Sequence, residues 1–211
     1  MRLLLINTCG AEGVVALAED ASILAVELLP GRSSSENLLP AVRRLMEARS
    51  WRVGDLAAIA VVIGPGSFTG VRVGLSAAKG LCEAGGVGLL AMSRLALVAA
   101  SVDAGSEVLA VLDAGRGEYF CGVYGAGVRV SEQLLRAEGV TALRQQREVV
   151  TCEARVAESL DGGVKLVAEP GPERMLAMAL TRIETGEWSD VASVDANYLR
   201  RTDAEILVHG R

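Results

Sequence analysis

Short apolar runs near the N-terminus predict three β-strands, over residues 2–7, 13–18 and 22–29. The connections between them are short, as in hairpins that join antiparallel neighbours. The first run, residues 3–6, is continuously apolar rather than alternating, which is typical of a strand that is buried on both faces. The pattern therefore predicts an antiparallel meander whose first strand lies in the middle of a sheet.

Amphipathic helices are predicted next to further buried strands. Apolar residues recur at helical spacing over residues 38–46. Pro40 places the start of this helix near Asn37, because a proline breaks few hydrogen bonds only in the first turn. Residues 57–63 form a second buried-strand pattern, and after a glycine-rich turn we expect a helix over about residues 70–84. These alternations indicate a mixed sheet covered by helices.

The remaining segments predict a second sheet with weaker patterns. We expect strands over residues 87–92, 107–113, 118–130 and 165–168, helices over 93–100, 153–160 and 173–185, and an extended segment at 197–200. Glycines separate the later strands, and no repeat is visible at a fixed period. The sequence therefore predicts an α/β protein with two lobes, an N-terminal lobe over residues 1–103 and a smaller, more divergent lobe over residues 104–211.

Composition and charge narrow the possible functions of this 211-residue chain. Hydrophobic residues make up 51% and charged residues 22%, so a folded protein is expected. The apolar runs are too short for a membrane span, and the first residues do not form a secretory signal, so we expect a cytoplasmic protein. The net charge is −5 and aromatic residues make up 3%. Strong independent binding to nucleic acid is therefore not expected, and contact with RNA would need a partner.

The cysteine and histidine content argues against a metal site or nucleophilic catalysis. The cysteines at 9, 82, 121 and 152 form no C-x-x-C pair, and they are expected to be buried as small apolar residues. The one histidine, His209, is the third residue from the end of the sequence. We therefore predict no catalytic residues and no bound metal.

A glycine-rich loop between a predicted strand and a predicted helix is the most informative segment. Its residues are Gly64, Pro65, Gly66, Ser67, Phe68, Thr69 and Gly70. Either the loop presents backbone N–H groups to an anion, or it is a tight turn in which Ser67 or Thr69 caps the helix. A P-loop is excluded, because Walker A spacing requires one residue fewer between the glycines and a lysine after the second.

The helix after this loop carries small residues on one face. Gly70, Gly74, Ala77, Ala78 and Leu81 share that face. Glycine in a helix interior costs roughly 1 kcal/mol relative to alanine, so a close contact is expected to offset it. That contact is either internal packing or an interface with another protein, and both remain open here.

Residues 64–81 closely resemble the signature of the bacterial TsaB (YeaZ) family. Residues 35–40 resemble the family's S-E-x-L-L-P, residues 112–119 its D-A-R-R-x-E-V-Y segment, and residues 198–200 its Y-L-R. The resemblance covers most of the chain and is densest in residues 1–120. It implies an actin/Hsp70-like (ASKHA) fold of two lobes.

The resemblance also implies a function without catalysis by this chain. Family members act as scaffold subunits that bind and activate TsaD, together with the ATPase TsaE, for N6-threonylcarbamoyladenosine modification of tRNAs reading ANN codons. ATP and metal are then expected on the partner subunits, and tRNA is contacted only through the complex. The older grouping of the family with M22 glycoproteases is not matched by protease residues here.

The resemblance places a partner and homodimer interface on the two neighbouring helices. The implied interface residues are Leu38, Leu39, Val42, Leu45, Met46, Gly70, Gly74, Ala77, Ala78 and Leu81, and the implied motif loop is residues 64–70 with Arg72. The free chain is expected to form a homodimer.

The sequence departs from the family pattern near residues 7–9, at residue 34 and again at residues 195–197. Asn7 and Cys9 stand where the family has I-D-T-S, and Ser34 stands where it has H-S-E. An asparagine is a poorer ligand than aspartate for a hard cation, which argues against an autonomous ATPase. Two alternatives remain: an active nucleotide-dependent transferase or metallopeptidase of the same fold, with Glu12, Asp113 and Glu118 as candidate ligands, or regulation by a small ligand held at the glycine-rich loop.

Overall fold

The computed structural model describes residues 1–30, 34–103, 105, 107–160 and 162–199. Their contacts group into two compact units, residues 1–97 with 169–196, and the described residues of 98–168 with 197–199. This division differs from the predicted boundary after residue 103. The predicted second lobe includes residues 169–196, whereas in the structure this segment returns to the first unit because an apolar helix face packs there.

A five-stranded sheet forms the centre of the first unit, in the order β3-β2-β1-β4-β5. β1 pairs antiparallel with β2 and parallel with β4, and β2 pairs antiparallel with β3. The N-terminal meander and the central place of its first strand are therefore confirmed. The strands are β1 (Arg2–Asn7), β2 (Gly13–Glu19), β3 (Ser22–Leu29), β4 (Ala58–Val62) and β5 (Gly88–Met92).

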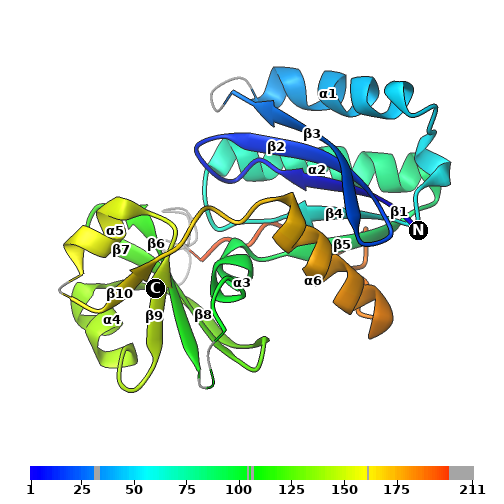
Figure 1. Cartoon of the computed structure of the whole chain (residues 1–211). Helices are drawn as coiled ribbons and strands as arrows, with labels where there is room; N and C mark the ends of the chain where they lie inside the picture. Colours follow the sequence, from blue (N-terminus) through cyan, green and yellow to red (C-terminus); the bar gives the residue numbers. More distant parts are fainter. Residues whose placement is uncertain (31–33, 104, 106, 161, 200–211) are drawn as a thin grey trace, which may run out of the picture. The chain divides into compact units, whose positions relative to one another are not determined.

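Helices cover both faces of this sheet, which explains its continuous apolar runs. α1 (Ser34–Ala48) and α2 (Phe68–Gly85) lie on one face, and α6 (Pro172–Glu184) lies on the other (Figure 1). Leu4 and Ile6 of β1 belong to the core under α1 and α2, whereas Leu3 and Leu5 belong to the core under α6. Alternate residues of one strand thus fill two separate cores. A short 3-10 helix, η2 (Val53–Asp55), follows α1, and α3 (Arg94–Ala99) follows β5.

The first residue of α1 differs from the prediction. The helix begins at Ser34 rather than near Asn37, so Pro40 lies inside it. Pro40 has no amide hydrogen to bond to the carbonyl of Glu36, and both residues are exposed. The prediction of the first residue was therefore wrong by about one turn of helix.

The second unit is built on a sheet of the same topology, with the order β8-β7-β6-β9-β10. β6 pairs antiparallel with β7 and parallel with β9, as β1 pairs with β2 and β4. α4 and α5 place Val140 and Val156 in a core on one face of the sheet. The elements are β6 (Val108–Gly115), β7 (Glu118–Gly125), β8 (Val128–Arg136), α4 (Ala137–Leu143), β9 (Glu148–Thr151), α5 (Ala154–Ser159) and β10 (Val164–Leu166).

Three features of the second unit were predicted incorrectly or missed. Residues 118–130 were expected to form one strand, but a turn at Ala126 and Gly127 divides the segment into β7 and the start of β8. Both turn residues have positive φ, a conformation that suits glycine and is uncommon for alanine. α4 and β9 were not predicted, because each is short and carries little periodicity. Residues 197–199 form no regular element, and Arg200 and His209 lie outside the described residues.

Candidate functional site

The glycine-rich loop packs against the end of β1. β1 and β4 are parallel neighbours, so the residues that follow them meet at one edge of the sheet. The amide of Ser67 donates a hydrogen bond to the carbonyl of Cys9 (2.9 Å), and the Thr8 hydroxyl donates to the carbonyl of Gly70 (2.6 Å). The Cys9 thiol lies 3.1 Å from the carbonyl oxygen of Val62 and donates to it. The loop is therefore tied to β1 and β4.

Three glycines make this close approach possible. A Cβ atom at Gly66 would lie 2.3 Å from the Cys9 carbonyl oxygen, and one at Gly70 would lie 1.9 Å from that of Thr8. At Gly74 it would lie 2.4 Å from the Thr8 hydroxyl oxygen. Separations this short are below any van der Waals contact. The small-residue face of α2 is therefore required, at these positions, by packing within the chain.

The hydrogen bonds of the loop support the interpretation as a tight turn. Ser67 is the N-cap of α2, and its hydroxyl accepts the amide of Gly70 at 3.2 Å. The carbonyl of Gly64 accepts the amide of Arg94 at 2.7 Å. The amides of Ser67 and Gly70 are thus bonded within the chain, as expected for a turn that caps the helix.

An ion pair between a buried arginine and a partly exposed glutamate lies beside this loop, and the sequence patterns did not predict it. The Arg94 guanidinium donates two hydrogen bonds to the carboxylate of Glu169, with Nε–Oε1 and Nη2–Oε2 distances of 2.9 and 2.7 Å. The Arg94 side chain is only 7% exposed, whereas that of Glu169 is 44% exposed. The two residues are 75 positions apart, so no local pattern could have paired them. The one available signal was an arginine at the start of a helix that is otherwise apolar.

Three of the four cysteine thiols are buried, and burial keeps them protonated at neutral pH. Burial raises the pKa of Cys9 and Cys121 to about 12 and that of Cys82 to about 11. Because the thiolate is the reactive form, these three thiols are poor nucleophiles at neutral pH. This agrees with the prediction that these three are buried apolar residues. For Cys152 the same prediction was wrong, because this residue is partly exposed.

We therefore expect one rapidly reacting thiol in the native protein. At pH 8, Ellman's reagent should modify Cys152 within minutes and the other three only after denaturation, because their raised pKa values leave almost no thiolate. Cys152→Ser should remove the fast phase, and Cys82→Ser should leave it unchanged. A fast phase of two or more thiols in the wild type would contradict this assignment.

The implied interface residues divide into a buried set and an accessible set. Leu38, Val42, Met46, Gly74 and Ala78 are buried, and the side chains among them fill the core between the helices and the sheet. Gly70 is buried against Thr8. Leu45, Ala77 and Leu81 are partly buried at the edge of the same core, and Leu39 is 54% exposed. A charged substitution at Leu38 would therefore disrupt the core, and any loss of binding could not be assigned to an interface.

Leu39 lies on the side of α1 that faces α2. Arg44, on the opposite flank of α1, pairs with Glu27 of β3. β3 is at one edge of the sheet and α2 contacts the other strands, chiefly β4. Leu39, Ala77 and Leu81 are hereafter called the α1–α2 seam. Whether this surface binds a partner stays a prediction.

Two of the remaining motif residues, Phe68 and Arg72, contact each other at the start of α2. Phe68 is 51% exposed, and the guanidinium of Arg72 lies 3.8 Å from the centre of its ring. This is a cation–π contact between residues one helical turn apart. Thr69 is exposed, and Pro65 follows Gly64 through a cis peptide bond.

The carboxylates considered as ligands do not gather into a metal site among the described residues. The Asp113 side chain accepts the amide of Gly115 at 2.8 Å, and the Asp113 amide donates to Glu153 at 2.6 Å. Within the described part of the chain, no group of three or more His, Cys, Asp and Glu side chains is placed to hold a metal ion.

The side-chain oxygen of Asn7 accepts the amide of Cys9 at 3.0 Å. None of the helices in this part is long and apolar enough to cross a membrane.

Two units that repeat one five-stranded topology define the class of actin/Hsp70-like (ASKHA) proteins. The ethanolamine utilization protein EutJ from Carboxydothermus hydrogenoformans shares the fold, with a TM-score of 0.55 over 85% of this chain and 90% of that one, at 13% identity. YeaZ from Pseudomonas aeruginosa is more similar, with a TM-score of 0.77 over 94% of this chain and 99% of that chain, at 28% identity. The expected fold class is confirmed.

Sequence comparison assigns the family. The family model of TsaD, tRNA N6-adenosine threonylcarbamoyltransferase, matches residues 29–161. The tRNA threonylcarbamoyladenosine biosynthesis protein TsaB of Escherichia coli is 34% identical over 128 residues, which are 59% of this chain and 55% of that protein. TsaB of Bacillus subtilis is 31% identical over 142 residues, 66% of this chain and 62% of that protein. These matches thus span less than two thirds of the relatives' length. The chain belongs to the TsaD-like family, within its TsaB (YeaZ) group.

Proposed function

We propose that the chain is an accessory subunit in the biosynthesis of threonylcarbamoyladenosine in tRNA. The similarity to TsaB over 128 residues, together with the YeaZ fold over 94% of the chain, carries the proposal. The chain would bind a TsaD protein and support its activity, with a TsaE-type ATPase, while ATP, metal and tRNA are held by the partners or by the complex. A homodimer would be the form of the free chain in the cytoplasm.

The chemistry of the described residues is consistent with a role in binding rather than catalysis. Burial raises the pKa of three cysteine thiols, and the loop that resembles an anion cradle bonds to the chain itself. The α1–α2 seam is an apolar strip with one exposed leucine, Leu39. Its other two residues, Ala77 and Leu81, pack against the buried core under the same two helices. An apolar strip on a well-packed pair of helices is the kind of surface that another helical pair can cover.

Reconstitution tests the role as an accessory subunit. The chain, TsaD and TsaE of the same organism, with the enzyme that supplies the threonylcarbamoyl donor, are incubated with unmodified tRNA, and the modified nucleoside is measured. Omission of this chain is expected to reduce product formation at least tenfold, and the chain alone is expected to form none. Equal product with and without the chain would overturn the proposal.

The seam is tested separately by substitutions that introduce charge. Leu39→Glu and Ala77→Asp are expected to weaken TsaD binding at least tenfold, because each would bury a carboxylate in an apolar interface. Leu28→Glu on β3 is the matched control, since Leu28 is 65% exposed and lies away from the seam. Affinity is measured by calorimetry. Unchanged affinity in folded seam variants would exclude this surface while leaving the accessory role open.

An enzymatic function is the second candidate, because the matching family model describes a transferase. It would require turnover by the purified chain without other subunits. Product formed from tRNA and a threonylcarbamoyl donor by this chain alone, or stoichiometric metal after purification, would favour this candidate over the accessory role.

A further inference from the structure

β3 is an edge strand of the first sheet, with β2 as its one neighbour among the described strands. An edge strand directs the N–H and C=O groups of every second residue away from that neighbour. The guanidinium of Arg49 donates to the carbonyl of Leu24 at 2.7 Å and covers one end of this edge. Residues 25–29 pair with β2 in continuous register, so the rest of the edge is regular.

Two apolar side chains on this edge strand are exposed. Val26 is 46% exposed and Leu28 is 65% exposed. Their partners on β2, Ala16 and Val14, are buried, and Ala16 belongs to the core under α6. The apolar layer of the α6 face therefore continues to the edge of the sheet, where it meets solvent. Val26 and Leu28 are hereafter called the edge pair.

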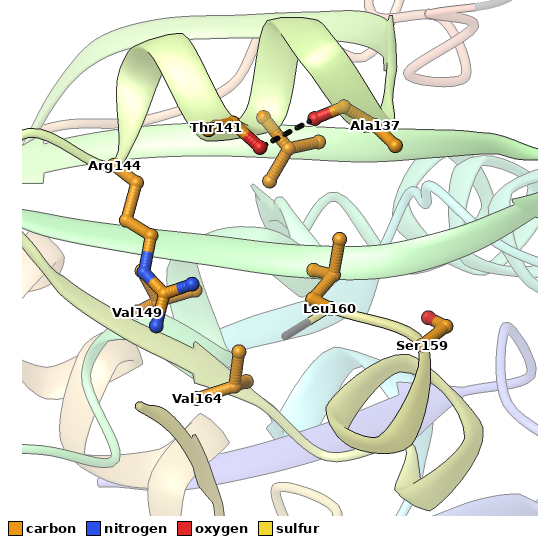
Figure 2. Close-up of a pocket in the computed structure, with 8 residues that line it drawn as sticks. Ala137, Thr141, Arg144, Val149, Ser159, Leu160 and Val164 are labelled. Atoms are coloured by element: carbon orange, nitrogen blue, oxygen red, sulfur yellow. Dashed lines mark hydrogen bonds between the residues drawn. The ribbon is translucent and has the colours of Figure 1, made fainter. Parts of the chain in front are cut away.

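The other three sheet edges in the described part of the chain are covered, short or charged. Ser189 covers β5, because its amide donates to the carbonyl of Leu89 at 2.9 Å. β10 has three residues, and its Val164 lines a pocket with residues of α4, α5 and β9 (Figure 2). β8 carries three charged residues. Proteins use such features to prevent pairing with another chain, whereas β3 contains neither lysine nor proline.

The opposite face of the β3 edge carries charges that balance. Glu27 lies opposite Val15, on the face covered by α1, and pairs with Arg44 of that helix. Arg43 and Glu47 of α1 form a second pair at 2.7 Å. This surface thus carries two positive and two negative charges in a chain whose net charge is −5. Two copies of it bring opposite charges together in equal numbers, which favours self-association over repulsion.

We propose that β3 pairs antiparallel with β3 of a second copy of this chain, so that the two sheets join into one. An antiparallel pair of identical strands has a two-fold axis, so both copies use the same residues. With the axis at Glu27, Val26 of each copy lies opposite Leu28 of the other, and the two edge pairs cover one another. Each Arg44 can then contact both Glu27 carboxylates, which offsets the approach of like charges.

This contact goes beyond the proposed accessory role and shares no residue with the α1–α2 seam. Leu28→Glu is therefore expected to reduce self-association through β3 while leaving TsaD binding intact. Leu39→Glu is expected to have the opposite effects. The two surfaces can thus be tested independently, and failure of one assignment leaves the other standing.

Analytical ultracentrifugation of the full-length chain with Leu39→Glu tests the contact, because this substitution blocks association through the seam. We expect dimers with a Kd of roughly 100 μM or below, in the weak range of small interfaces. Adding Leu28→Glu is expected to raise the Kd roughly tenfold or more, because a carboxylate would be buried opposite Val26. Adding Leu166→Glu is the matched control without effect, since Leu166 is 53% exposed on the edge strand β10.

Charge reversal and hydrogen exchange locate the contact. Arg44→Glu in the Leu39→Glu chain is expected to weaken the dimer, because it places like charges beside both Glu27 carboxylates. Adding Glu27→Arg to that variant restores the balance and is expected to restore the dimer. The amides of residues 25–29 are expected to exchange more slowly above the Kd than well below it. Circular dichroism confirms that each variant is folded.

Three results would overturn the proposal. One is a Leu39→Glu chain that stays monomeric up to about 1 mM, where even a weak contact would be populated. Another is equal dimerisation with and without Leu28→Glu in folded variants. The third is slower exchange at residues 25–29 only after TsaD is added, which would assign the β3 edge to that partner.

Discussion

Gly70→Ala is expected to destabilise the protein by about 2–3 kcal/mol, whereas Gly80→Ala in the same helix is expected to stabilise it by about 1 kcal/mol. At Gly70 the new methyl group would lie 1.9 Å from the carbonyl oxygen of Thr8. Neither side can move easily, because the Thr8 hydroxyl also bonds to the Gly70 carbonyl and Thr8 directly follows β1. The clash outweighs the better helix propensity of alanine.

Gly80 is the matched control for this substitution. It lies on the exposed side of α2, and a Cβ atom there would meet nothing within 4 Å. Only the difference in helix propensity then changes the unfolding free energy, and it favours alanine. Urea unfolding of the two variants measures both effects. An increase in stability for both would show that α2 does not approach Thr8 as closely as the structure indicates.

Glu169→Ala is expected to cost about 3 kcal/mol in unfolding free energy, at least twice the cost of Arg94→Met. Removing the glutamate takes two hydrogen bonds from a guanidinium whose side chain is 7% exposed. Removing the arginine leaves a carboxylate that is 44% exposed and can be solvated by water. Glu169→Ala keeps the buried charge of Arg94, so it should lose more unfolding free energy than Arg94→Met.

Denaturant titration of these two variants and the double variant measures the asymmetry. Glu169→Gln is a useful companion, because it keeps the size of the side chain and one acceptor oxygen while removing the charge. We expect its cost to lie between those of Arg94→Met and Glu169→Ala. Equal costs for Glu169→Ala and Arg94→Met would show that burial of Arg94 does not control this pair.

Local patterns were sufficient for several strands of the first unit. The runs over residues 2–7 and 22–29 coincide with β1 and β3, and the buried pattern over residues 57–63 contains β4. These segments are strongly apolar and have clear turns between them, so their conformation depends little on distant residues. α4 and β9 were missed because they have seven and four residues and no strong period.

At the candidate site, too, local residue patterns predicted some features, and contacts between residues distant in sequence decided the others. The sequence singled out Gly70 and Gly74 as residues that something must approach closely, and left open whether that contact was internal. The contact is the Thr8 backbone and hydroxyl, more than sixty residues away. For the α1–α2 seam, periodicity showed that Leu38 and Leu39 belong to one amphipathic helix. Only packing on the sheet showed that Leu38 is buried and Leu39 is exposed.

By itself, the sequence determined the family, the meander with its central first strand, and the need for glycine along one face of α2, because these depend on residues close together in the chain. The tertiary structure alone decided the return of residues 169–196 to the first unit, the pairing of Arg94 with Glu169, and the identical strand order of the two sheets. Each of these joins residues that are distant in sequence. Such contacts form when apolar faces pack together and buried charges pair in the folded chain. Residue spacing along the sequence does not predict which distant residues meet.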